Sequence, residues 1–71
     1  MTAAEMAANV ELSRVHITKQ NAIIARLIEQ GHYKMADEAR RILARMHEHL
    51  AFEVGMLERM QGDPTSRGQF S

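Results

Sequence analysis

A single glycine, Gly31, separates two long segments that contain almost no helix-breaking residues, and this spacing constrains the fold more than any other feature of the chain. Residues 2–30 contain neither glycine nor proline, and a glycine directly after such a segment is typical of the left-handed residue that ends a helix. Thr2 and Glu5 have the spacing of a capping box, in which each side chain accepts a hydrogen bond from a free amide of the first turn. We therefore expect a first helix over residues 3–30.

The segment after this glycine predicts a second helix over residues 35–61. It has no good N-cap residue, but Asp37 and Glu38 would lie in its first turn, where the helix dipole favours carboxylates. Gly62 and Pro64 follow its last apolar residues and indicate where it ends.

Apolar residues repeat along both segments at alternating intervals of four and three, which is the pattern of helices that pack side by side. The first segment carries Met6, Val10, Ser13, Ile17, Gln20, Ile24 and Leu27. The second segment carries Ala39, Leu43, Met46, Leu50, Glu53, Leu57 and Met60. When the chain folds back on itself, the two series pair one to one about a midpoint near Tyr33. We therefore expect an all-α fold, an antiparallel two-helix hairpin over residues 1–62, followed by a flexible C-terminal tail over residues 63–71.

Two of the paired positions are polar. Ser13 would face Glu53, and Gln20 would face Met46. Polar residues in such a seam usually fix the pairing register at a cost in stability. The alternative is a catalytic role for Glu53 or Gln20, and we favour the role in fixing the register.

One side of the predicted hairpin carries a second apolar stripe that the hairpin alone would leave in water. We call this stripe the apolar flank, and it comprises Leu12, His16, Ile23, Met35, Ile42, His49, Phe52 and Met56. An exposed apolar stripe of this length is typical of a surface that binds a partner, and the simplest partner is a second copy of the chain. We expect a homodimer in which two hairpins form an antiparallel four-helix bundle of the coiled-coil kind.

The formal net charge is zero, but the charges are unevenly placed along the chain. Residues 19–46 carry six basic and three acidic side chains, whereas the rest of the chain carries three basic and six acidic ones. Two hairpins stacked head to tail would place each basic tip beside the partner's acidic open end. Surface pairs of this kind select an orientation more than they add stability. A neutral balance is also not typical of a general nucleic-acid-binding protein.

Two histidines and a carboxylate form a candidate metal site. His16 and His49 would lie on the apolar flank in facing layers, with Glu53 one turn after His49. Such a group can bind a divalent metal ion, and a histidine pair can also make an interface respond to pH. The alternative is that both rings fill a partly buried interface. We favour this alternative because the spacing matches no known metal-binding motif.

Three arginines near the basic tip, Arg40, Arg41 and Arg45, are the candidates for contacts with phosphates. Asp37 and Glu38 lie among them, and few aromatic residues are available to stack on bases. We favour a solvated face in which Asp37 pairs with Arg41, and nucleic-acid binding stays open as the alternative.

The strongest resemblance to known proteins lies in the run His16-Ile-Thr-Lys-Gln-Asn-Ala-Ile-Ile-Ala-Arg-Leu-Ile-Glu-Gln-Gly-His32, which is followed by Ala36, Ala39, Leu43 and Leu50. This pattern resembles a group of short bacterial proteins of uncharacterised function that share a Leu-x-x-x-Gly-His turn. Members commonly carry Asp-Thr after the turn, where this chain has Tyr33-Lys34. The resemblance implies a helical hairpin and no particular activity. In architecture alone the hairpin also resembles the RNA-regulating plasmid repressor of the Rop type, a likeness that carries no function.

The functional expectation is an interaction or adaptor module that binds a second copy of the chain, or another protein, through the apolar flank. The alternative is a Rop-like RNA-binding regulator that uses the three arginines. We expect neither an enzyme nor a cofactor, because no nucleophile, base and orienting group share a predicted face. The chain has no cysteine, no recognisable secretion signal and no apolar segment of membrane length, so we expect a cytoplasmic location without membrane contact.

Overall fold

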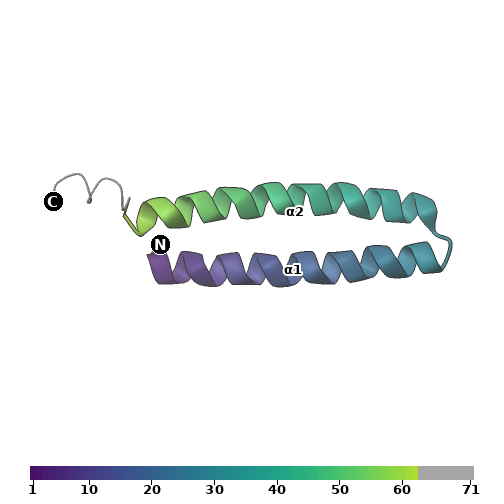
Figure 1. Cartoon of the computed structure of the whole chain (residues 1–71), viewed down its shortest axis with the longest axis horizontal. Helices are drawn as coiled ribbons and strands as arrows, with labels where there is room; N and C mark the ends of the chain where they lie inside the picture. The colour runs from purple at the N-terminus through teal and green to yellow at the C-terminus, as the bar shows by residue number, and fades with distance from the viewer. Residues whose placement is uncertain (63–71) are drawn as a thin grey trace.

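The computed structural model of this chain describes residues 1–62, which form two antiparallel helices joined by a tight turn (Figure 1). Helix α1 spans Ala3–Glu29 and helix α2 spans Tyr33–Met60. The helices pack against each other along their length, and the described part of the chain contains no strand. The expected all-helical hairpin is therefore confirmed. The predicted tail, residues 63–71, lies outside the described residues.

The first helix begins at the predicted capping box. The Thr2 amide donates to the Glu5 carboxylate at 2.7 Å, and the Glu5 amide donates to Thr2 Oγ1 at 3.1 Å. The bond from the Thr2 amide, followed by the interaction with the Thr2 side chain, lowers the pKa of Glu5 below its ordinary value. The box thus satisfies two amides that the first turn would otherwise leave without a partner.

Gly31 ends α1 in the left-handed conformation that its position after the first segment predicted. Its φ of +79° lies in a region that glycine adopts at little cost. The His32 amide donates to the Leu27 carbonyl at 2.8 Å, and the Gly31 amide donates to the Ile28 carbonyl at 3.0 Å. These two bonds form a Schellman motif, which satisfies the last carbonyls of α1 and turns the chain back toward α2.

Helix α2 begins at Tyr33, two residues before the predicted start at residue 35. His32 occupies the N-cap position and its side chain makes no capping hydrogen bond, so the helix starts directly from the Schellman turn. Because of this earlier start, no acidic residue lies in the first turn, and the predicted placement of Asp37 and Glu38 there is wrong. Both helices also end one residue before their predicted ends, at Glu29 and Met60.

The core is a thin layer between the two helices. Every residue of the predicted seam is buried or half-buried, so both series lie at the contact between the helices. One small residue outside the predicted series, Ala36, is completely buried. No large side chain among the described residues is fully buried, so the hairpin alone removes little apolar surface from water. The buried apolar residues are Met6, Val10, Ile17, Ile24, Ala36 and Ala39.

The two polar seam positions differ in how well their partners were predicted. Ser13 faces Glu53, as expected, and its hydroxyl donates to Glu53 Oε1 at 2.5 Å. Gln20 was expected to face Met46, but its amide nitrogen donates to the backbone carbonyl of Ala39 at 3.0 Å. Both bonds join α1 to α2 at defined positions, which is what a role in fixing the register requires.

Candidate functional site

The apolar flank is largely exposed in the structure. Its large apolar side chains on both helices keep half or more of their surface in contact with solvent: Leu12 53%, Ile23 50%, Met35 54%, Ile42 50% and Phe52 62%. Both histidines of the flank are exposed as well, while Met56 is half-buried. An apolar surface of this extent on one side of a small protein is typical of a binding site.

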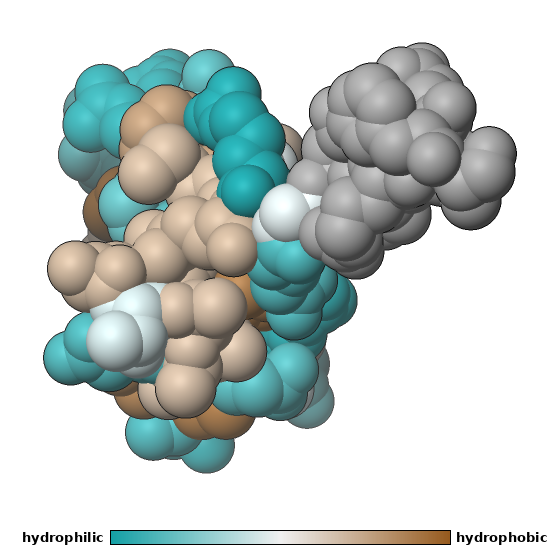
Figure 2. Space-filling model, turned by 90° about the vertical axis from the view of Figure 1, so that its left-hand side faces the viewer, coloured by the Kyte–Doolittle hydropathy of each residue, from teal (hydrophilic) through white to brown (hydrophobic). Residues whose placement is uncertain are grey.

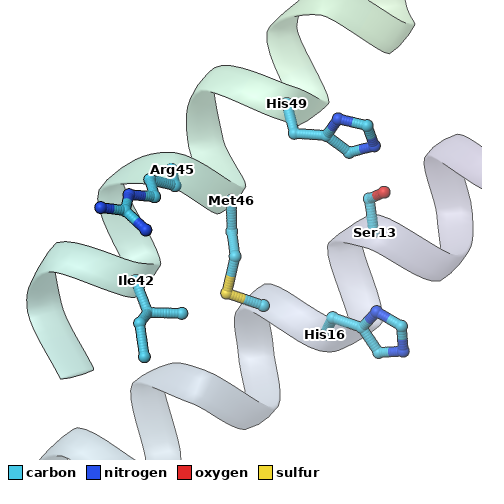
Figure 3. A pocket seen from close by; sticks show the side chains of 6 residues that line it. All are labelled: Ser13, His16, Ile42, Arg45, Met46 and His49. Carbon is cyan, nitrogen blue, oxygen red and sulfur yellow. The ribbon is translucent and has the colours of Figure 1, made fainter.

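A pocket of about 230 Å³ opens in the middle of this flank (Figure 3). Helix α2 provides most of its wall, and α1 provides the rest. Figure 3 shows Met46 lying between the helices and the His49 ring turned toward Ser13. The lining is mainly apolar, with a guanidinium and two imidazoles at its edge. The residues that line the pocket are Ser13, His16, Ile42, Arg45, Met46 and His49.

A small polar cluster lies beside the pocket, centred on a buried carboxylate. Only 8% of the Glu53 surface is exposed. Its Oε1 accepts the hydrogen bond from Ser13, and its Oε2 lies 3.4 Å from His49 Nε2. A carboxylate taken out of water needs such partners, because an unpaired buried charge costs several kcal/mol. The cluster thus explains how the hairpin tolerates Glu53 in its seam.

We expected that no nucleophile, base and orienting group would share one face of the hairpin. This expectation is wrong, because Ser13, His49 and Glu53 lie together on one face. Their order of contact is nevertheless not that of a hydrolytic triad, in which the histidine stands between the nucleophile and the acid. Here the carboxylate stands in the middle, so the serine hydroxyl donates to Glu53 and not to His49. The bond from Ser13 to Glu53 joins α1 to α2 at this layer.

The candidate metal ligands are only partly brought together. His49 and Glu53 are neighbours, and His16 lies across the pocket from His49. Within residues 1–62, however, no group of three histidine, cysteine, aspartate or glutamate side chains has the geometry to hold a metal ion. The interpretation of both histidines as part of an interface surface fits this geometry better.

Two of the three arginines near the tip have different surroundings in the structure. Arg40 pairs with Asp37 at 2.9 Å, so the predicted pairing of Asp37 with Arg41 is replaced by one with the preceding residue. Arg45 lines the pocket on the apolar flank. Because successive residues of a helix are about 100° apart, Arg40 and Arg45 point in directions about 140° apart. The three side chains are therefore spread over about 140° of the surface of α2.

Sequence reasoning missed the pocket, although the heptad pattern contains a signal for it. Arg45 lies three residues after Ile42 and four before His49, so it shares their side of α2.

Apolar surface also extends over the open end of the hairpin, between hydrophilic patches (Figure 2). Met1, which is 74% exposed, lies at this end.

Neither helix of the described part combines the length and the apolarity that a membrane span requires. Comparison with models of protein families, with curated proteins and with solved structures finds no match to this chain. The resemblance to short bacterial hairpin proteins therefore stays an expectation from the sequence.

Proposed function

We propose that this protein is an interaction module that associates with a second copy of itself through the apolar flank, as a head-to-tail dimer with two-fold symmetry. The observation that carries this proposal is the row of large apolar side chains, half or more exposed, on one side of the hairpin. A surface of this kind in water favours association, because covering it removes apolar area from solvent.

The thin core supports the same proposal. Small domains bury a low fraction of their surface, and chains of this size commonly need a disulfide, a metal ion or a partner for stability. The chain has no cysteine, and residues 1–62 contain no group of three or more histidine, aspartate or glutamate side chains that could hold a metal ion. A second copy packed on the apolar flank would complete a core that a single hairpin only begins.

The size of the flank suits a stable dimer. Helix α1 has 27 residues. At a rise of about 1.5 Å per residue and a helix diameter of about 10 Å, two helices side by side offer a face of about 800 Å². Each protein in a stable complex typically contributes about 800 Å² to the interface.

The charge distribution selects the orientation. Residues 19–46, around the turn, carry six basic and three acidic side chains. The other described residues, toward the open end, carry two basic and five acidic side chains. A head-to-tail arrangement brings the basic tip of each copy to the acidic open end of the other, whereas a parallel arrangement would bring two basic tips together.

Light scattering coupled to size-exclusion chromatography tests this proposal. The wild-type protein is expected at twice the chain mass of 8.1 kDa, and Ile42→Glu is expected to dissociate because a charge would be buried in the interface. Val15→Glu is the matched control, since Val15 is similarly exposed, at 46% against 50% for Ile42, but lies outside the apolar flank. A wild-type monomer at micromolar concentration, or equal effects of the two substitutions, would overturn the proposal.

The adaptor role would use the same flank, with another protein replacing the second copy. The alternative of an RNA-binding regulator has less support, because Arg40, Arg41 and Arg45 point in different directions. An RNA-binding measurement at low salt tests that alternative. RNA binding by the wild-type protein that each of the three arginine-to-alanine substitutions weakens to the same extent would favour it.

A further inference from the structure

The pocket on the apolar flank has a lining that suits an aromatic ring. Arg45 can interact with a ring face through its guanidinium, and Met46 through its sulfur. Ile42 adds an apolar wall. The volume of about 230 Å³ is sufficient, because an apolar cavity of about 150 Å³ already admits a benzene molecule.

The same flank presents a ring of matching size. Phe52 is 62% exposed and lies on the side of α2 that carries Arg45, two helical turns away. Within one hairpin the Phe52 ring does not line the pocket. A second copy can bring the two together.

We infer that Phe52 of each copy inserts into the pocket of the other, so that a pair of reciprocal ring-in-pocket contacts fixes the register of the dimer. This inference rests on the proposed dimer. A head-to-tail dimer with a two-fold axis across the helices stacks α2 on the partner's α2 in antiparallel direction. A residue a given number of positions after the axis then faces the residue the same number of positions before it.

Three features of the chain place this axis at the layer of His16 and His49. His16 is the central residue of α1, 13 residues from both Ala3 and Glu29, so an axis there overlaps the two α1 helices completely. Phe52 and Met46 lie three residues on either side of His49, which brings each ring opposite the partner's pocket.

The third feature is an apolar pair at the same centre. Ile42 and Met56 lie seven residues before and after His49, and both belong to the apolar flank. An axis at His49 therefore packs Ile42 of one copy against Met56 of the other. A shift of the register by one helical turn would move Ile42 away from Met56 of the other copy. It would also move the Phe52 ring away from the pocket.

We expect substitution of Phe52 to weaken the dimer strongly, and substitution of a similarly exposed residue outside the flank to leave it unchanged. Phe52→Ala is expected to raise the dissociation constant of the dimer by at least about 30-fold, as for a central anchor of an interface. Tyr33→Ala is the matched control, because Tyr33 is 65% exposed but lies outside the flank, and it is expected to leave the constant unchanged. Circular dichroism would verify that both variants keep their helices.

An isotope-filtered nuclear Overhauser experiment on a dimer of labelled and unlabelled chains tests the contact directly. The inference predicts transfer between the Phe52 ring of one copy and the Met46 methyl group of the other. A dimer without this transfer, or a dimer that Phe52→Ala leaves intact, would overturn the inference and leave the dimer standing. A monomer under all conditions would overturn the proposed function together with it.

Discussion

The Ser13 hydroxyl on α1 donates to Glu53 Oε1 on α2 at 2.5 Å, and this bond ties the two helices at one defined position of the seam. Glu53 is buried, and its second oxygen lies 3.4 Å from His49 Nε2. The bond to Ser13 specifies a register, since a slip of either helix would separate Glu53 from Ser13, whereas His49 lies on the same helix as Glu53 and would move with it.

Ser13→Ala removes the direct partner of a buried carboxylate oxygen. We expect the free energy of unfolding to fall by about 1 to 3 kcal/mol, measured by urea denaturation at a fixed protein concentration. The double variant Ser13→Ala with Glu53→Leu is expected to recover this loss, because two apolar groups replace the polar pair. A double variant less stable than the single one would show that the pair stabilises the hairpin in its own right.

Substitution by alanine should change the stability in opposite directions at Gly31 and at Gly55. An added Cβ would meet nothing within 4 Å at Gly31 or at Gly55, so crowding does not separate the two sites. Gly31 has a φ of +79° and Gly55 lies inside α2. Gly31→Ala is expected to cost about 1 to 2 kcal/mol, whereas Gly55→Ala should add about 1 kcal/mol of stability. Thermal melts of both variants measure this difference, and a loss in both would contradict the conformational argument.

The capping box makes the start of α1 dependent on pH. The pKa of Glu5 is lowered by the Thr2 amide first and by the Thr2 side chain second. The box therefore stabilises α1 above the ordinary carboxyl pKa, and this contribution is lost as the pH falls through the lowered value. In an NMR titration, Thr2→Ala should raise the pKa of Glu5 only part of the way, because the backbone amide remains. Thr18→Ala is the control: the Thr18 hydroxyl donates to the Arg14 carbonyl, so its removal should leave the pKa of Glu5 unchanged.

Arg45 and Arg40 should differ in their effect on association. Arg45 lines the pocket, whereas Arg40 is paired with Asp37 on the exposed surface. Arg45→Ala is expected to weaken the dimer by about tenfold, and Arg40→Ala to change it by less than about threefold, as is usual for an exposed ion pair. Sedimentation equilibrium measures both constants. Equal effects would indicate that overall charge, and not the pocket, controls association.

Much of the fold was predictable because its determinants are local. The φ of Gly31, the Thr2–Glu5 box and the pairing of Ser13 with Glu53 follow from residue type and spacing alone. The start of α2 was not predictable from its side chains, because the Schellman turn carries the chain into Tyr33 without a capping residue.

The remaining details depend on three-dimensional placement. The bond from Gln20 to the Ala39 carbonyl has no signature in the sequence, since every residue offers the same backbone carbonyl oxygen. The apolar flank and its histidines could be placed from periodicity. The pocket between His16 and His49 depends on how far side chains from two helices reach, which spacing does not specify.

The head-to-tail dimer is tested most directly by distances between spin labels, because a chain without cysteine accepts one label per copy at a chosen site. For Gln30→Cys, beside the turn, a dimer centred on His16 predicts a separation of about 40 Å between the two labels. For Val15→Cys, near the centre of α1, we expect a much shorter separation. A short distance at Gln30, or no coupling between labels at either site, would contradict the head-to-tail dimer.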